Sequence, residues 1–312
     1  MNENFNYKGL SEKELIGLCS DKLATKRHRV AYWTSEAYSF GEHYRNYGYY
    51  PSFLPLFVYS DHGVGGIQEV FKHELENNAP AFFVFNEKKY KNYKKQSRKP
   101  CYITIPPLIW YRKHNKIEQS KNAKGTIAFP SHSTPEVDSC FDIRKYIEEL
   151  KSLPEDMQPV CVCLHMHDIN KGRHKIFLEN NIPVYTAGNA FDIRYAQRFY
   201  DILRNFKYSC SNLIGSYTYY SIEMKIPFSL FGESCKYINK ADANLEHGTY
   251  NYKNKDYLLE EKIFLGIHKE ITPQQKKIVE NNTNNPKAIS RLKMAKILWL
   301  SYFKHKIRKV FK

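Results

Sequence analysis

The chain lacks the short glycine-rich motifs that identify many nucleotide-dependent enzymes and hydrolases. Its 312 residues contain no GxxxxGK[ST] loop, no GxGxxG after the first expected strand and no GxSxG. These absences argue against a P-loop enzyme, a dinucleotide-binding dehydrogenase and a typical α/β-hydrolase. A DxD sequence of the kind that often chelates a metal–nucleotide pair is also missing, which favours chemistry without a metal.

Cysteine pairs and long apolar runs are missing as well. The seven cysteines are scattered and odd in number, without the CxxC pairs of a zinc site. This pattern predicts reduced thiols in a cytosol and no disulfide framework. The N-terminus has no apolar leader, and no stretch of about 18 apolar residues occurs, so we expect neither a signal peptide nor a membrane span.

Acidic residues are too few to balance the basic ones. The 48 Lys and Arg residues exceed the 32 Asp and Glu residues, which gives a net charge of +16. Such a field attracts nucleic acid, phosphorylated ligands or an anionic membrane surface. The basic residues gather in two places, residues 88–99 and the C-terminal tail 291–312.

Strand-like and helix-like segments alternate along most of the chain. Strands are expected over residues 28–34, 54–60, 81–86, 101–110, 125–131, 159–168, 182–188, 208–216 and 226–232. Helices are expected over 65–78, 141–153, 192–206, 217–224, 271–282 and 288–312. This alternation predicts an α/β fold with parallel, doubly wound sheets.

A polar segment interrupts the alternation near residue 115. Residues 111–124 are charged and lack hydrophobic periodicity, which predicts an interdomain linker. We therefore expect one Rossmann-like domain over residues 1–115 and another over 116–285. A basic amphipathic helix over 286–312 follows them.

Hydroxyl and imidazole groups follow the strand expected at 125–131. Ser131, His132, Ser133 and Thr134 occupy its end and the loop after it. Open α/β sheets bind ligands at this end of their strands, and a helix N-terminus nearby favours a phosphate. A capped turn also explains the hydroxyl groups, but a cap does not require His132.

A similar loop follows the strand at 208–216. Gly215 allows close approach of the backbone, and Ser216 and Thr218 present hydroxyl groups at the start of a helix. This geometry suits a phosphate or diphosphate ester. Many α/β units contain such a turn, so this loop indicates a ligand site only in combination with the loop at His132.

Two other strand ends hold candidate ligand contacts. His165 lies near the end of the strand at 159–168, where both a ligand contact and a purely structural histidine are open interpretations, and metal ligation is disfavoured. Gly188 lies in the turn after the strand at 182–188. In a nucleotide-binding half this turn would lie beside the base and ribose, although a simple turn and helix cap also explains it.

Asp61 and His62 follow the strand at 54–60, in the sequence SDHGVGG. A carboxylate or an imidazole at a strand end suits a general base. The alternative is an ordinary turn and helix cap, which Asp and Gly also favour.

These features together resemble the GT-B glycosyltransferases, and more narrowly the bacterial capsule and lipopolysaccharide transferases, including the sialyltransferase-like group. The resemblance rests on two Rossmann-like halves, a linker, the FPSHST loop and the segment GSYTYYSIEMKIP. It implies two domains facing a cleft, with the acceptor bound by residues 1–115 and the sugar nucleotide by 116–285.

The resemblance also implies roles for individual residues. Two loops match those that hold the nucleotide phosphate in that group, one with His132, Ser133 and Thr134 and the other with Gly215, Ser216, Tyr217 and Thr218. Asp61 matches the general base of some members, with His62 beside it, and either can take the acceptor proton. His132 is then the acid or the hydrogen-bond donor to the departing nucleotide.

The implied activity is transfer of a sugar from a nucleotide-activated donor to a cell-surface glycan such as capsule, O-antigen or lipooligosaccharide, with inversion and without a metal or other cofactor. Expected partners are the donor, a glycan or lipid-linked glycan acceptor, and an anionic membrane surface that binds residues 288–312 on the cytoplasmic side. The tail can instead pack onto the protein. A CDP-polyol phosphotransferase and a basic nucleic-acid-binding protein are the alternative functions.

Overall fold

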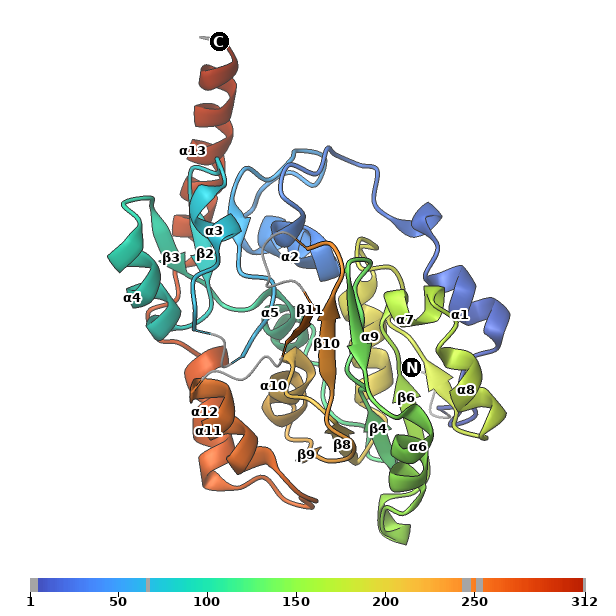
Figure 1. The fold of residues 1–312 in the computed structure, drawn as a ribbon. Helices are drawn as coiled ribbons and strands as arrows, with labels where there is room; N and C mark the ends of the chain where they lie inside the picture. The colour runs from blue at the N-terminus through green and yellow to red at the C-terminus, as the bar shows by residue number, and fades with distance from the viewer. Residues whose placement is uncertain (1–4, 66–67, 243–247, 251–254, 311–312) are drawn as a thin grey trace.

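Two parallel sheets organise the chain, whose computed structural model describes residues 5–65, 68–242, 248–250 and 255–310 (Figure 1). The smaller sheet has the order β1-β2-β3, with bounds Tyr59–Ser60, Phe82–Val84 and Cys101–Ile103. The larger has the order β7-β6-β4-β8-β9, formed by β4 (Thr126–Ala128), β6 (Val160–Cys163), β7 (Val184–Tyr185), β8 (Tyr208–Ser211) and β9 (Phe228–Leu230). The α/β class predicted from the sequence is confirmed.

The order of the larger sheet reverses at β4. The chain runs outward from β4 through β6 to β7, then returns to pair β8 with the other side of β4. All of these pairings are parallel, so the strands end at the same edge. A crevice at the carboxyl ends of β4 and its neighbours is the usual ligand position in such a sheet.

A third sheet was not predicted. It is antiparallel, with the order β11-β10-β5 and the bounds Gly248–Tyr250, Lys236–Asn239 and Val137–Cys140. Its strands are short and only partly apolar, so they lack the hydrophobic run that marks a buried strand. Strand β5 begins directly after the His132 loop and helps to fix it.

Helices cover the sheets. Their bounds are α1 Glu12–Leu18, α2 Phe40–Tyr47, α3 Lys72–Glu76, α4 Glu87–Gln96, α5 Pro107–His114, α6 Ile143–Lys151, α7 Met166–Asn170, α8 His174–Glu179, α9 Tyr195–Leu203, α10 Ser216–Glu223, α11 Lys255–Phe264, α12 Pro273–Thr283 and α13 Arg291–Val310. None of the helices in the described part of the chain combines the length and the apolar composition needed to cross a bilayer.

Several predicted segments differ from the structure. Residues 28–34 form an irregular loop, not a strand, and end in a 3-10 turn at Trp33–Ser35. The strand expected over 101–110 ends at Ile103, because two prolines follow and α5 begins at the second of them. The first four residues of the predicted linker, 111–114, therefore belong to α5. Of the helix expected over 65–78, the described residues form only α3, and residues 66–67 lie outside them.

The two parallel sheets share one hydrophobic core. Phe83 of β2, Ile127 of β4 and Phe228 of β9 all belong to its largest cluster of buried side chains. The N-terminal segment bonds to the larger sheet, and the C-terminal segment bonds to the smaller one. Leu10 N donates to Val184 O (2.8 Å) at the larger sheet, and Ile289 N donates to Ile103 O (2.9 Å) at the smaller. Each end of the chain thus lies on the sheet built by the other half.

A buried ion pair fixes the loop that precedes the smaller sheet. Arg45 of α2 donates to both carboxylate oxygens of Glu36, at 2.8 and 2.6 Å, and its Nε donates to Leu54 O at 3.0 Å. His28 Nε2 lies 3.2 Å from the same carboxylate. Gly41 leaves the space for this pair, since a Cβ there would lie 1.8 Å from Glu36 Oε2.

Removing the cation from this pair is expected to destabilise the fold strongly. Arg45→Leu leaves the Glu36 carboxylate buried without its main partner, which typically costs about 3–5 kcal/mol. Urea denaturation followed by circular dichroism measures the change. The control is Lys91→Ala, which removes the exposed pair with Glu87 on α4 and is expected to cost less than about 1 kcal/mol. Equal effects of the two substitutions would contradict a structural role for the buried pair.

Candidate active site

The strand ends of the two parallel sheets meet at one contact. Ser216, the first residue of α10, accepts a hydrogen bond from Val64 N (2.9 Å) and donates one to Val64 O (3.1 Å). Val64 lies in the loop after β1, and Ser216 begins the helix that follows β8. The SDHG segment therefore lies next to the carboxyl edge of the larger sheet.

Histidines from three strand ends gather near this contact. The rings of His132, after β4, and His165, after β6, stack with centroids 4.3 Å apart. The ring centroids of His167 and His165 lie 4.9 Å apart. His62, after β1, lies close enough that the charge of His132 helps to lower its pKa. The sequence had placed each of these histidines at a strand end, but not in one cluster.

The hydrogen bonds of the stacked pair fix which nitrogen of each ring carries the proton. His165 Nδ1 accepts from His167 N (3.3 Å), so its Nε2 carries the proton of the neutral ring. Nε2 is buried and has no hydrogen-bond partner among the described residues. His132 Nδ1 donates to Ser133 O (3.0 Å), which leaves its Nε2 free to accept a proton. One ring thus offers a donor and the other an acceptor.

Burial keeps His62 and His165 neutral. It lowers the pKa of His62 to about 4, against the opposing effect of the Asp61 carboxylate. Burial also places the pKa of His165 well below its ordinary value. The His62 ring lies 4.9 Å from Trp33, and its Nδ1 is buried with no partner in the described part of the chain. Both imidazoles can therefore exchange hydrogen bonds with a ligand without first losing a proton.

Asp61 is held by a buried lysine. Lys89 Nζ of α4 lies 3.4 Å from Asp61 and 2.7 Å from Glu74, and the lysine side chain is 1% exposed. The ammonium group of Lys89 thus pairs with the carboxylates of both Asp61 and Glu74. Burial and the neighbouring Asp61 raise the pKa of Glu74 to about 7, while Lys89 opposes the shift. Because Asp61 is already paired, His62 is the less engaged of the two predicted bases.

The hydroxyl groups of the loop after β4 bond within the protein. Ser131 Oγ lies 2.9 Å from Ser139 Oγ, and Ser133 Oγ accepts from Ser139 N at 3.1 Å. Thr134 Oγ1 accepts from Val137 N at 3.0 Å. These three residues, predicted to contact the donor, tie the loop to β5. Of the four predicted residues of this loop, His132 is the one whose side chain belongs to the histidine cluster.

The loop after β8 is likewise used mainly for internal contacts. Tyr217 is partly buried, donates to Leu213 O (2.8 Å) and stacks on Phe129. Thr218 Oγ1 accepts from Gly215 N at 3.3 Å. With these side chains bonded internally, a ligand can bond in this loop to the backbone at the start of α10, where Gly215 is the N-cap.

Gly188 contacts the N-terminal segment of the chain. Its φ is +84°, and a Cβ there would lie 2.6 Å from Leu18 O. Asn189 N donates to the same carbonyl at 2.8 Å. The space beside Gly188, predicted for the base and ribose, is therefore filled by residues 18–20, which the sequence gave no reason to place there.

The sequence analysis missed residues that position the site. Lys89 lies in the basic run 88–99, which is explained equally by attraction of an anionic ligand and by a solvated helix face, and neither explanation predicts a buried lysine. Asp168 is 2% exposed; its Oδ1 accepts from Ser133 N and from Arg173 Nη1, both at 3.2 Å. Trp33 was placed in a strand. Among the described residues no group of three or more His, Cys, Asp or Glu side chains is arranged to hold a metal ion.

No protein-family model matches the chain, and no curated protein is detectably similar to it. Function is therefore inferred from the geometry and chemistry of the site.

The low pKa of His62 predicts a specific response to acid. The folded-state value of about 4 lies below the roughly 6.5 of an unfolded chain, so the unfolded state binds more protons between these values. His62 therefore contributes stability above pH 6.5 that is lost as the pH falls toward 4, about 2 kcal/mol of it by pH 5. The raised pKa of Glu74 acts in the opposite direction, so a variant must isolate the effect.

The variant is His62→Asn, compared with the wild type by urea denaturation at pH 7.5 and pH 5. The free energy of unfolding of the variant, relative to that of the wild type, is expected to rise by about 2 kcal/mol on acidification. An unchanged difference would mean that His62 titrates as it does in the unfolded chain.

Proposed function

We propose that the chain is a glycosyltransferase that moves a sugar from a nucleotide-activated donor to a cell-surface glycan, with two Rossmann-like parts arranged as in the GT-B enzymes. The observation that carries the proposal is the cluster of histidines where the strand ends of two parallel sheets meet. His62 comes from one sheet, and His132 and His165 come from the other.

The donor is assigned to the edge formed by β4, β6 and β8. The reversal of strand order at β4 favours this edge, and the backbone at the start of α10 suits a phosphate group. The unpartnered Nε2–H of His165 provides a hydrogen bond to a phosphate oxygen. His132 Nε2, once protonated, provides a second to the departing nucleotide. These contacts need no metal, and we propose a metal-independent reaction.

His62 is assigned as the general base and Asp61 as the residue that anchors its loop. A neutral imidazole can accept the proton of an acceptor hydroxyl group as that oxygen attacks the anomeric carbon. Its pKa of about 4 is low for this role in the free protein. A bound anionic donor raises the pKa of a nearby imidazole, which moves His62 toward the working pH only when the donor is present.

The test is a thermal-shift panel of CMP, CDP, UDP, GDP and ADP, each with and without EDTA. A nucleotide that binds only the folded state raises the melting temperature by mass action. We expect one nucleotide to do so independently of EDTA, and His132→Ala or His165→Ala to abolish the shift. His268→Ala, a half-buried histidine away from the cluster, is the control and should retain it.

Turnover tests the base separately. With the matching sugar nucleotide, His62→Gln is expected to lower the rate of nucleotide release by about 100-fold or more, the usual range for a general base. Nucleotide binding should persist in this variant. Failure of every nucleotide to shift the melting temperature, or full turnover in His62→Gln, would contradict the donor site or the assigned base respectively.

We also propose that α13 holds the protein at an anionic membrane surface. Its first half packs on the body, with Met294 and Leu298 buried against Gly48, while its far end extends away from it (Figure 1). On that end Phe303 and Ile307 lie one turn apart and are 52% and 56% exposed. Exposed Lys304 and Lys306 flank them, and a basic and apolar helix face of this kind favours anionic lipid.

Substitution of this face should release the protein from vesicles. Phe303→Glu and Ile307→Glu are each expected to weaken sedimentation with phosphatidylglycerol vesicles by about tenfold or more, since burying a large apolar side chain contributes about 1.5 kcal/mol or more. Leu259→Glu, at a 59% exposed leucine on α11, is the matched control and should bind like the wild type. Equal binding by all four proteins would exclude this face as the attachment site.

A further inference from the structure

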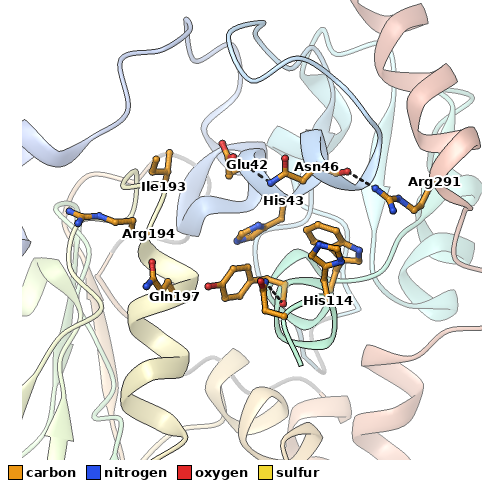
Figure 2. A pocket seen from close by; sticks show the side chains of 11 residues that line it. Glu42, His43, Asn46, His114, Ile193, Arg194, Gln197 and Arg291 are labelled. Atoms are coloured by element: carbon orange, nitrogen blue, oxygen red, sulfur yellow. Dashed lines mark hydrogen bonds between the residues drawn. The ribbon is translucent and has the colours of Figure 1, made fainter. Parts of the chain in front are cut away.

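A groove on the helical side of the molecule is separate from the histidine cluster. Its main pocket has a volume of about 500 Å³ and lies between α2, α5, the start of α9 and the start of α13 (Figure 2). A second pocket of about 280 Å³ adjoins it through Ile193 and Arg194, which line both. The two together form a binding surface longer than a single small molecule requires.

The groove is basic along its length. Six of its lining side chains are cationic or can become so: Lys22, Lys26, Arg27, His114, Arg194 and Arg291. Its two carboxylates offset part of this charge, since Glu42 lies 4.0 Å from Arg27, and Asp192 lies 2.9 Å from Arg198 and 3.7 Å from Arg194. A ligand in the groove therefore meets a net positive surface and is expected to be an anion.

The floor of the main pocket contains a buried, unpartnered imidazole nitrogen. His43 is 4% exposed, and its Nδ1 has no hydrogen-bond partner among the residues that the structure describes. Burial lowers its pKa to about 3, so the ring is neutral. Its Nε2 lies 3.2 Å from Ser39 Oγ. The Ser39 hydroxyl donates its proton to Tyr38 O, so His43 Nε2 is the donor in this contact. Nδ1 is then left as an acceptor, which suits a ligand hydroxyl group.

The aromatic rings of the pocket are largely covered by histidines. The His114 ring stacks on Trp110 with centroids 4.8 Å apart, and the His43 ring lies 4.7 Å from Tyr111. Nucleic acids usually bind such surfaces by stacking bases on open aromatic faces, and those faces are occupied here. The amide groups of Asn46 and Gln197, which also line the pocket, suit hydroxyl groups instead (Figure 2).

We propose that this groove binds an acidic oligosaccharide. The arginines and lysines pair with its carboxylates, while the amides and His43 Nδ1 bond to its hydroxyl groups. The identification of this saccharide as the acceptor chain of the transferase rests on the proposed function. The binding of an acidic saccharide to the groove does not depend on that function. The groove also adjoins the site, because Tyr38 contacts His165 (centroids 6.0 Å apart) and the next residue, Ser39, contacts His43.

The conformation of this connection is unusual. Tyr38 and Ser39 both adopt left-handed backbone conformations, with φ of 58° and 59°. Such conformations cost free energy in residues other than glycine and occur often at functional sites. The start of α9 holds the pair: the ring centroids of Tyr38 and Tyr195 lie 5.1 Å apart, and Ser39 Oγ accepts from Ala196 N.

Calorimetric titration of the full chain tests the inference. The probes are a tetramer of galacturonic acid, a neutral glucose tetramer and a short single-stranded oligothymidine. We expect the acidic tetramer to bind, and the neutral one to bind at least about tenfold more weakly because it makes no charged hydrogen bonds. Arg194→Gln and Lys26→Gln should each weaken the acidic tetramer by about tenfold on the same basis. Lys277→Gln, which removes an exposed charge on α12, is the control.

The outcomes separate this inference from the proposed function. No binding of the acidic tetramer, or binding that Arg194→Gln and Lys26→Gln leave unchanged, would overturn the groove assignment even if a nucleotide raises the melting temperature. Tighter binding of oligothymidine than of either saccharide would overturn it in favour of nucleic acid. Saccharide binding that requires Arg194, without any nucleotide response, would support the groove and leave the transferase proposal refuted.

Discussion

The candidate site depends on one close contact between the two parallel sheets. Ser216 Oγ bonds to both the N–H and the carbonyl of Val64, which fixes the loop after β1 against the loop after β8. This contact adds to the shared hydrophobic core in holding His62 in place relative to His132 and His165. A hydroxyl group that the sequence suggested for a phosphate is therefore better understood as the joint between the two halves of the site.

Burial of neutral imidazoles is the second constraint. Each buried histidine lowers stability in acid, yet the arrangement leaves nitrogens of His62 and His165 without partners among the described residues. Polar atoms of this kind are uncommon in folded proteins, because an unsatisfied buried group costs about 1–3 kcal/mol. Two of them lie in the histidine cluster and a third is at His43, and the proposals above assign each of the three to a ligand. Lys89 plays the complementary part, because it neutralises Asp61 and keeps the SDHG loop fixed.

Much of the fold follows from patterns in the sequence, whereas most of the site does not. The buried strands at 126–128 and 160–163 are mostly apolar, and the alternation of such strands with amphipathic helices predicted the parallel sheets. The same reasoning put His62, His132 and His165 at strand ends. It could not show that Ser133 and Thr218 bond internally, because cap residues and ligand contacts share the same residue types.

Other features of the site could not be predicted because they depend on contacts between residues far apart in the chain. The buried position of Lys89 depends on Glu74 and Asp61, which are 15 and 28 residues away in the chain, and no local pattern marks it. The groove is formed by helices from four distant segments. One of them, α2, lies where the sequence predicted no element, and another, α5, lies where it predicted a strand and a linker. The space beside Gly188 is filled by residues 18–20 for the same reason.

Imidazole ¹⁵N NMR of the intact protein, recorded with and without the nucleotides, tests the central claim most directly. The account predicts a His165 ring protonated on Nε2, a His132 ring with a proton on Nδ1, and a His62 ring that stays neutral well below pH 6. It also predicts that one nucleotide shifts the signals of His132 and His165 together. A His62 ring that titrates near pH 6.5, with no nucleotide altering any of these signals, would contradict it.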